Sequence, residues 1–371
     1  LAGKMTDDAL LDAVCRLAER LVAAGFRHPG LDDGRLLARP AGDGWELALP
    51  DLQDASLGQP VDPGRAAATL GWAIPFFQHL PAREREERFA AVRAAAGSGL
   101  TWHGVEREWA GETGARWRMR RWLRGGAAAF CRAGTACLAA PGVDSALLEE
   151  LVAAARRGGE GTSVLKHDTK RQLWRVRHDG RHYVVKRYVR GAAFGKVDRG
   201  RRAWLAAALL HDLRIDCAPC LGLLRDASRD CYLVMEDVGS SDVHTLLKEH
   251  PQDGPLARRV LALAAAYLAL MHRRGVWHRD MKCSNFVVDG GAERILLCDL
   301  EDTSCRGRIA ETMAVRTFVQ FLSYLPGPVK ARQRLRFLAV YARERGLSRS
   351  EFRRLYAALK LAGGERIWQG Q

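Results

Sequence analysis

The chain has 371 residues, enough for two domains, and 47% of them are hydrophobic, so a packed core is expected. Lysine and arginine outnumber aspartate and glutamate by 58 to 43, and the net charge of +15 favours an anionic partner such as a nucleotide, a nucleic acid, an anionic glycolipid or a membrane surface. The longest apolar run, residues 260–271, is too short to cross a bilayer, which argues against an integral membrane protein.

The start of the chain and the cysteines bear on cellular location. Residues 1–10 include Asp7 and Asp8 and lack the basic-then-apolar order of a signal peptide, so cytoplasmic residence is expected. The nine cysteines form no disulfide framework, and their odd number favours reduced thiols. Because the sequence begins with Leu1 and not with Met, we also consider a segment upstream of it.

Residues 1–100 repeat, in degenerate form, features of a later part of the chain. In both places an amphipathic helical stretch is followed by a Gly-x-x-His segment, an Asp-Leu-x-Asp-x-Ser segment and a Leu-Pro pair. The order and spacing of these landmarks favour an internal repeat over the alternative, chance similarity between two Arg- and Ala-rich stretches. The matched segments are residues 10–23 with 260–273, 25–28 with 275–278, 51–56 with 299–304, and 80–81 with 325–326.

Residues 101–160 are predicted to form a basic, helical linker. Its centre, Arg116–Arg124, interleaves arginines with large apolar side chains that include Trp117 and Trp122. Such a segment can lie on an anionic membrane surface, with the indole rings at the interface and the guanidinium groups on the headgroups. The alternative is a solvated basic helix that packs its two tryptophans on the next domain.

A sheet-rich half, residues 161–240, is predicted to precede a helical half, residues 241–371. Residues 173–177 alternate between apolar and polar side chains, and residues 182–188 are rich in types that suit a pleated surface. His178-Asp179-Gly180-Arg181 between them supplies a turn, so the pattern predicts a β-hairpin. The next predicted elements are a helix over 199–213, a strand over 231–235, and then mainly helices.

The strongest local signal is H-R-D-M-K-C-S-N at residues 278–285, followed by two short apolar strands around a Gly-Gly turn and then by Asp299. Phosphoryl transfer requires a protein to position an acceptor hydroxyl, hold the metal ion and neutralise charge. Asp280 would orient the hydroxyl and accept its proton, while Lys282 would lie against the transferring phosphoryl oxygens. Asn285 and Asp299 offer the oxygen ligands that Mg²⁺ prefers. A chance H-x-D match would have to explain all of these residues in order.

A second set of residues is predicted to bind the nucleotide. Lys186 ends a Val-Val-Lys strand, as a lysine that reaches the α and β phosphates should. A lone lysine at a strand end is usually only solvated, but here a helix, a strand and the H-R-D segment follow in the order of a two-lobed kinase. The other candidate ATP contacts are Lys170 in a phosphate-covering turn, and Glu236 and Val238 after the strand over 231–235.

At these residues the chain resembles the protein-kinase-like superfamily, and in detail the lipopolysaccharide kinase family, the bacterial Kdo and heptose kinases. The resemblance runs from about Arg116 to Ala358 and implies an α+β, bilobal protein-kinase-like fold, a small antiparallel-sheet N-lobe followed by a helical C-lobe. It also implies ATP and Mg²⁺ as cofactors, with Lys186 for the nucleotide, Asp280 as catalytic base, and Asn285 and Asp299 for the metal. Residues 185–188 and 201–204 are also similar to the strand and the first large helix of the lipopolysaccharide kinase family, and residues 337–341 are similar to its C-terminal part.

The chain departs from the pattern of eukaryotic kinases in several places. It has no G-x-G-x-x-G, so side-chain charge in the turn Lys166–Arg171 would substitute for close backbone approach. Asp-Leu-Glu stands at 299–301 in place of D-F-G, and no A-P-E follows, so control by an activation loop is not expected. No glutamate lies between Lys186 and residue 211 to pair with that lysine, and Asp198 is the only nearby acid. This gap weakens the prediction of activity most.

The first copy of the repeat lacks the catalytic residue types. Where the second copy has Asp280, Lys282 and Asn285, the first has Gly30, Asp32 and Arg35, and only Asp51 remains of the set. Residues 1–100 are therefore predicted to be a catalytically dead, kinase-like helical lobe that acts as a scaffold or regulator. Its own sheet-rich half would lie upstream or would have been lost.

The resemblance implies phosphorylation of a sugar hydroxyl, Kdo or heptose, in the inner core of lipopolysaccharide, by an enzyme peripheral to the cytoplasmic face of the inner membrane. Basic residues after Asp299 fit an anionic acceptor: Arg306, Arg308, Arg316, Lys330 and Arg332. The alternatives are a protein Ser/Thr or small-metabolite kinase of the same fold, and a pseudokinase scaffold. Nucleic-acid binding rests on charge alone, because no reading motif accompanies it.

Overall fold

The computed structural model describes most of the chain. The described residues are 7–26, 36–49, 52, 55–58, 63–78, 80–96, 99–123, 130–132, 135–167, 171–189, 198–239, 241–250, 254–289, 294–327 and 329–364. Their side chains are described as well, except at 64–65, 68, 82, 112 and within 115–136.

The chain divides into two compact units. The first comprises residues 1–115 together with 273–275, and the second comprises residues 116–272 and 276–371. Among the described residues, no helix combines the length and the apolar character that crossing a membrane would require.

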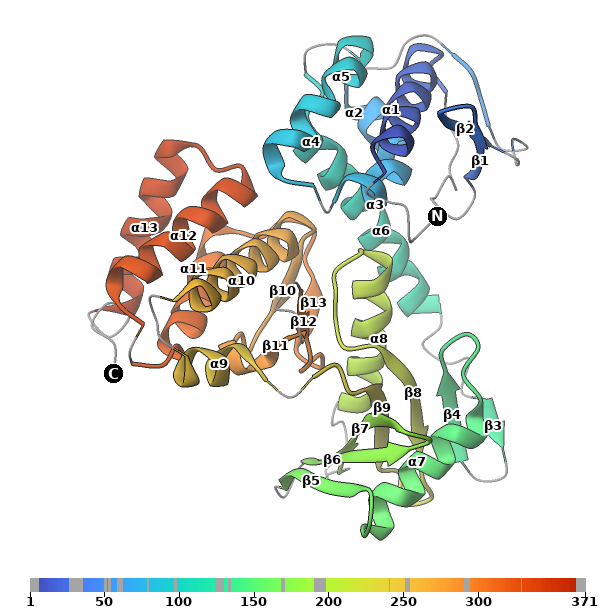
Figure 1. Ribbon diagram of the computed structural model, residues 1–371, viewed down its shortest axis with the longest axis vertical. Helices are drawn as coiled ribbons and strands as arrows, with labels where there is room; N and C mark the ends of the chain where they lie inside the picture. The colour runs from blue at the N-terminus through green and yellow to red at the C-terminus, as the bar shows by residue number, and fades with distance from the viewer. Residues whose placement is uncertain are drawn as a thin grey trace. The chain divides into compact units, whose positions relative to one another are not determined.

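Where the structure describes it, the first unit is helical with one β-hairpin (Figure 1). Helix α1 (Asp8–Ala23) begins at Asp7, whose side chain accepts hydrogen bonds from the backbone of Ala9 and Leu10. Its apolar face packs in a core that contains Trp72, Phe89 and Trp102. The other elements are β1 (Leu37–Ala41), β2 (Gly44–Ala48), α2 (Pro63–Thr69), η3 (Leu70–Ala73), α3 (Ile74–Phe77), α4 (Ala82–Arg88), α5 (Ala90–Ala96) and α6 (Trp102–Leu123).

A buried cluster of charges lies in the first unit. Glu106 on α6 is 1% exposed and pairs with Arg273 at 2.5 Å and with Arg274 at 3.1 Å. The Arg274 guanidinium also lies over the ring of Trp109, 5.1 Å from its centroid. Burial raises the pKa of Glu106, but the two arginines outweigh burial and hold that pKa well below its usual range. Within the first unit, the Glu106 carboxylate therefore joins α6 to the short segment 273–275.

The second unit begins with a seven-stranded antiparallel sheet in the order β3-β4-β8-β9-β7-β6-β5. Helix α7 (Ser145–Arg157) lies across one face of this sheet, as Figure 1 shows. Helix α8 (Arg199–Asp212) contacts β7, β8 and β9. The strands are β3 (Phe130–Arg132), β4 (Thr135–Ala139), β5 (Thr162–His167), β6 (Arg171–His178), β7 (Arg181–Tyr188), β8 (Cys220–Arg225) and β9 (Cys231–Glu236).

The sheet extends further back along the chain than the sequence predicts. Part of the expected linker, residues 101–160, is not a linker: β4 pairs with β8, and α7 covers the sheet. Leu148 and Leu151 of α7 are buried against Trp174 and Val185 of the sheet. The physical reason is that this face of the sheet is apolar and would otherwise face water.

The hairpin expected between the predicted strands is confirmed. Strands β6 and β7 pair over their full lengths, with His178 opposite Arg181. Asp179 and Gly180 at the turn have φ of 47° and 74°, the left-handed conformation that a tight two-residue hairpin turn requires. The predicted helix over 199–213 and the predicted strand over 231–235 are present as α8 and β9.

A helical lobe with short strand pairs completes the second unit (Figure 1). Its core contains an aromatic cluster in which Phe318, Phe321, Phe337 and Tyr341 contact one another. Its elements are α9 (Val243–Glu249), α10 (Pro255–Arg273), β10 (Val276–His278), η4 (Cys283–Asn285), β11 (Phe286–Val288), β12 (Ile295–Leu297), β13 (Thr303–Cys305), α11 (Glu311–Ser323), α12 (Ala331–Arg345) and α13 (Arg349–Gly363). The second unit thus has the α+β, bilobal kinase-like fold that the sequence predicts.

Candidate active site

Strand β7 directs Lys186 away from α7 and toward the helical lobe. Val185 packs in the core under α7, and successive side chains on a strand point to opposite faces, so Lys186 lies on the other face. Its neighbours across the sheet are Leu173 on β6 and Leu233 on β9. Lys186 is only 8% exposed, so its ammonium group requires anionic partners.

Two carboxylates meet the Lys186 ammonium. Asp299 accepts a hydrogen bond from Nζ, and the Glu301 Oε2 atom lies 3.0 Å from it. Burial lowers the pKa of Lys186, but Glu301 and Asp299 outweigh burial and raise it, so the lysine is charged. Lys186 and Asp299, predicted from separate motifs, are thereby in direct contact.

The H-R-D segment is fixed by the pairing of β10 with β13, in which His278 lies opposite Thr303. The His278 Nε2 atom lies 2.5 Å from the backbone oxygen of Asp299, and the backbone N–H of Asp280 donates to Nδ1 at 3.2 Å. Burial lowers the pKa of His278, and one neutral tautomer satisfies both contacts, with the proton on Nε2. One imidazole therefore connects Asp280 to Asp299.

Asp280 and Lys282 form a partly exposed ion pair. Their Oδ2 and Nζ atoms are 2.8 Å apart, and the side chains are 37% and 31% exposed. The hydrogen bond to Asp280 raises the pKa of Lys282. The Lys282 ammonium also lies over the ring of Tyr324, 5.1 Å from its centroid. Both side chains remain accessible to an acceptor, as the sequence-based roles require.

Asn285 and Asp299 are held near each other by the β11–β12 hairpin. Phe286 pairs with Leu297, and the backbone N–H of Cys298 donates to the backbone oxygen of Asn285 at 3.0 Å. The Asn285 amide nitrogen donates to the backbone oxygen of Asp280 at 2.8 Å, so the amide oxygen points elsewhere. Burial raises the pKa of Asp299, but Lys186 and other partners outweigh burial and hold it well below its usual range. An amide oxygen and an ionised carboxylate suit Mg²⁺ beside phosphates.

Glu301 is the residue that sequence reasoning missed. It is 4% exposed and contacts Lys186, and its Oε2 atom accepts a hydrogen bond from the Tyr188 hydroxyl at 3.1 Å. Arg171 Nη1 lies 3.5 Å from Glu301 and 3.6 Å from Asp299. One feature of the sequence could have indicated this role. Glu301 is an acid two residues after Asp299, at the position where the D-F-G motif has glycine.

The nearby acid noted in the sequence, Asp198, is engaged elsewhere. Its side chain caps α8 by accepting from the backbone N–H of Arg201, and it forms an ion pair with Arg225. Lys170, predicted to contact phosphates, lies outside the described residues. Arg171, the next residue, reaches the carboxylates of the site from β6.

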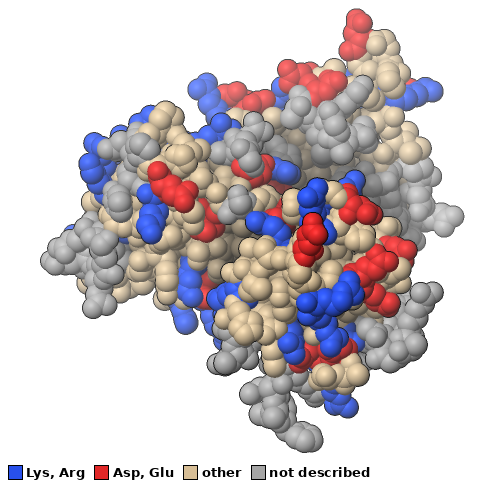
Figure 2. Space-filling model, turned by 60° about the horizontal axis from the view of Figure 1, so that its bottom comes forward, with Lys and Arg blue, Asp and Glu red and all other residues tan. Residues whose placement is uncertain are grey.

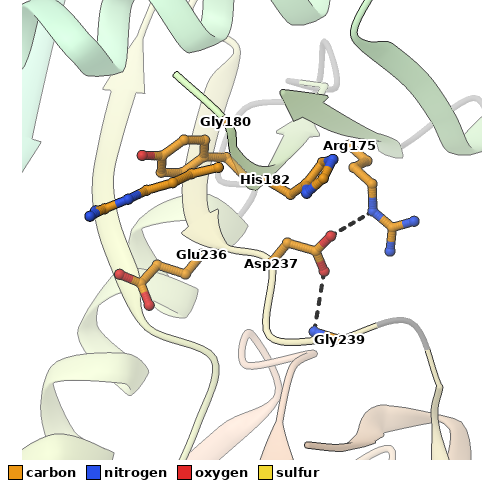
Figure 3. Close-up of a pocket in the computed structure, with 8 residues that line it drawn as sticks. Arg175, Gly180, His182, Glu236, Asp237 and Gly239 are labelled. Carbon is orange, nitrogen blue, oxygen red and sulfur yellow. Dashed lines mark hydrogen bonds and ion pairs between the residues drawn. The ribbon is translucent and has the colours of Figure 1, made fainter. Parts of the chain in front are cut away.

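A pocket of about 650 Å³ lies where β9 ends (Figure 3). The Arg175 guanidinium pairs with Asp237 at 2.6 Å, and the Asp237 carboxylate also accepts from the backbone N–H of Gly239 at 3.3 Å. Glu236 lines this pocket, and its carboxylate points away from the Arg175–Asp237 pair in Figure 3. Val238 is half-buried in the same turn.

One wall of the pocket lies on the face of the sheet that carries Lys186, while Tyr183 and Glu236 line it from the α7 face. His182, which lines the pocket, is four residues before Lys186 on β7, a separation of about 13 Å along a strand. Alternation places both side chains on the same face. The predicted nucleotide residues therefore fall into two groups, Glu236 and Val238 at one end of β7 and Lys186 at the other.

Parts of this chain are similar in sequence to known kinases. Residues 223–341, from β8 into α12, match the family model described as "Lipopolysaccharide kinase (Kdo/WaaP) family". The "Putative cyclin-dependent kinase F-2" of Oryza sativa subsp. japonica is 32% identical over 155 residues, which are 38% of this chain and 43% of that protein. The match thus spans less than half of the rice protein.

Solved kinase structures are also similar to this chain. The Mycobacterium tuberculosis PknI kinase domain is 18% identical, covers 55% of this chain and 97% of its own, and gives a TM-score of 0.34. A double mutant of that domain is 16% identical, covers 55% of this chain and 96% of its own, and gives a TM-score of 0.33.

Proposed function

We propose that this chain is an ATP-dependent kinase whose acceptor is a sugar hydroxyl of the lipopolysaccharide inner core, Kdo or heptose. The observation that carries the proposal is one continuous set of contacts. Lys186 contacts Asp299, His278 joins Asp299 to Asp280, and Asn285 donates to the backbone of Asp280. These contacts link the residues that we propose to bind the nucleotide, to act as the base and to hold a cation, which supports the proposal.

Each residue has a task in this proposal. Lys186 holds the α and β phosphates, and the pocket beside Glu236 and Val238 receives the base. Asp280 orients the acceptor hydroxyl and takes its proton, while Lys282 faces the phosphoryl oxygens. Mg²⁺, when bound by Asn285 and Asp299, supplies neutralisation of phosphate charge. The side chains of Asp280 and Lys282 are partly exposed, so an acceptor can reach them.

An anionic glycolipid as acceptor is supported by the family match and by basic side chains after Asp299. The guanidinium groups of Arg306 and Arg316 lie over the ring of Trp277, 5.7 and 5.8 Å from its centroid. Trp277 directly precedes His278, so these charges lie next to the H-R-D segment in the fold. On the face shown in Figure 2, basic and acidic side chains are interspersed, which favours local contacts over a long nucleic-acid surface.

We also propose, as the sequence predicts for residues 1–100, that the first unit contains a degenerate kinase helical lobe. Helix α1 leads into Gly25 with φ of 60°, and α10 leads into Gly275 with φ of 68°. The antiparallel hairpin β1–β2 follows α1 as β11–β12 follows α10. The diagnostic positions Gly30, Asp32, Arg35 and Asp51 lie outside the described residues, so the dead-lobe assignment stays a prediction.

Peripheral attachment to the cytoplasmic face of the inner membrane remains part of the proposal. Helix α6 continues through the basic segment as far as Leu123, and Arg124 lies outside the described residues. The side chains of Arg116–Arg124 are likewise outside them. Sedimentation of the protein with phosphatidylglycerol vesicles, compared with phosphatidylcholine vesicles, tests this attachment.

Labelled transfer tests the proposed reaction. The full chain is incubated with γ-labelled ATP and Mg²⁺ in the presence of lipid-linked core sugars, peptides or small alcohols. Label on the lipid-linked sugars, lost in Asp280→Asn, supports the proposal. Transfer only to peptides or small alcohols favours a kinase of the same fold with another acceptor, and nucleotide binding without transfer to any acceptor favours a pseudokinase scaffold.

A further inference from the structure

A kinase lysine of this type is commonly held by a glutamate on the helix that follows it. In this chain α8 occupies that place, and its only acid is Asp212, the last residue of the helix. Asp198, just before the helix, is committed to Arg225 and to the helix cap. The glutamate that would hold Lys186 is therefore absent from α8.

Glu301 supplies the missing carboxylate from the opposite lobe. It lies between β12 and β13, and its two oxygens are 3.0 and 3.3 Å from the Lys186 ammonium. The Tyr188 hydroxyl, two residues from Lys186 on the same face of β7, donates to the same carboxylate. At 4% exposure, Glu301 has little freedom to turn away.

We propose that Glu301 is the positioning residue for Lys186, taking the part of the absent helix glutamate in the phosphotransferase proposed above. Asp299 also contacts Lys186, but its carboxylate is the candidate metal ligand and would share its negative charge between the ammonium group and the cation. Glu301 keeps the ammonium in place when Asp299 turns toward a cation. The inference rests on the proposed function and adds to it the residue that completes the nucleotide site.

The location of Glu301 has a mechanical consequence. Lys186 belongs to the sheet and Glu301 to the helical lobe, so their ion pair connects the two lobes directly. In a kinase whose partner glutamate lies on the helix, movement of that helix makes and breaks the pair. Here neither partner belongs to α8, so the position of that helix does not by itself set the pair, whose geometry depends on how the two lobes are placed.

The decisive experiment is a double-mutant cycle on nucleotide binding by the full chain. Titration with Mg²⁺–ATP compares wild type, Glu301→Gln, Lys186→Met and the double variant, and kcat and KM follow wherever transfer is detected. Glu301→Gln is expected to weaken nucleotide binding by about tenfold or more, because it breaks a buried ion pair. In the Lys186→Met background the same change is expected to alter binding less than about twofold.

Two further variants separate positioning from general loss of structure. Glu301→Asp, which keeps the charge with a shorter reach, is expected to be intermediate, and it replaces Glu301→Gln if that variant fails to fold. Asp198→Asn is the matched control, because asparagine also caps helices and the residue does not contact Lys186. Its nucleotide affinity is expected to equal that of wild type.

The outcomes are distinguishable. Fully additive losses in the double variant, or wild-type binding by Glu301→Gln, would overturn the positioning role. If the main effect of Glu301→Gln is a higher Mg²⁺ requirement that persists without Lys186, Glu301 is a metal ligand instead. If wild type binds no Mg²⁺–ATP, the proposed function itself fails, and the positioning role fails with it.

Discussion

His278 and Asp299 are joined by a hydrogen bond of 2.5 Å from the imidazole Nε2 to the backbone oxygen. The same ring accepts the backbone N–H of Asp280 on its other nitrogen. The loop that carries the candidate base and the loop that carries the candidate metal ligand are therefore positioned by one buried side chain. His278 has no exposed surface, so it contacts neither solvent nor acceptor directly.

Replacement of this ring is expected to impair turnover more than nucleotide binding. His278→Phe keeps an aromatic ring but removes both hydrogen bonds, so Asp280 is no longer held relative to Asp299. Misplacement of a catalytic group by about 1 Å can lower the rate by about 100-fold. Steady-state kinetics with the preferred acceptor measure kcat and the KM for ATP. An unchanged kcat would show that the ring has no positioning role.

Asp280→Asn is expected to lower kcat by orders of magnitude while nucleotide affinity stays close to that of wild type. The carboxylate is partly exposed and is needed mainly when the acceptor proton moves. Thermal shift with Mg²⁺–ATP reports binding and labelled transfer reports turnover. Arg279→Gln, on the exposed neighbouring side chain that pairs with Asp302, serves as control. A parallel loss of binding and turnover would contradict the assignment of Asp280.

The buried His272 is expected to lower the free energy of unfolding at acidic pH. It is fully buried, donates to or accepts from the Tyr341 hydroxyl at 2.8 Å, and burial lowers its pKa from 6.5 to about 3. The unfolded chain therefore binds a proton below pH 6.5 that the folded protein does not, so stability falls as the pH decreases from 6.5 to about 3. The slope is about 1.4 kcal/mol per pH unit, or about 2 kcal/mol at pH 5 relative to pH 7.

The acid effect is measured by urea unfolding at pH 7 and pH 5, with hydrogen exchange of α10 as the readout. His272→Gln keeps a hydrogen-bond partner for Tyr341 and is expected to lose most of the pH dependence. His211→Gln, at a largely exposed histidine, is expected to retain it. Equal slopes in wild type and His272→Gln would exclude His272 as the source.

Glu106 is expected to be essential for the stability of the first unit. Glu106→Ala leaves two buried guanidinium groups without their carboxylate, and such a break costs about 3–5 kcal/mol. Limited proteolysis and hydrogen exchange of residues 8–115 in the full chain report the loss. Glu108→Ala, two positions along the helix and half-exposed, is the control. Similar protection in both variants would contradict this role.

A substitution at Gly222 on β8 tests how closely α7 packs on the sheet. A Cβ there would lie 2.2 Å from Leu148 and 2.9 Å from the backbone oxygen of Leu138, so the strand or the helix must shift. Gly222→Ala is expected to destabilise the second unit by about 1–3 kcal/mol. Gly111→Ala on α6, where a Cβ meets nothing within 4 Å, is expected to be neutral or slightly stabilising. Thermal unfolding of the two variants measures this difference in stability.

The parts of this fold that depend on neighbouring residues were predictable from sequence. Asp179-Gly180 specified the β6–β7 turn because only a few residue types tolerate its backbone conformation. The H-R-D segment and the strands after it were recognised because their residues lie together in the chain. Sequence order also placed Lys186 in the N-lobe ahead of the catalytic loop.

The parts that depend on distant pairing were not predictable in the same way. Glu301 lies 115 positions from Lys186, and nothing local marks it as the partner of that lysine. The role of α7 was missed because its apolar side chains pack on a distant part of the chain. Leu148 and Leu151 contact Trp174 on one face of the sheet, and the sequence near the helix does not indicate this packing. A basic composition around the helix instead suggested a linker.

The proposed function requires Lys186 and Asp299 to belong to one nucleotide site. This requirement is tested by isothermal titration of the full chain and of the Lys186→Met variant with Mg²⁺–ATP. We expect a single saturable site in wild type and binding weakened at least about tenfold in the variant. Equal affinity in the two proteins, or no binding by wild type, would contradict it.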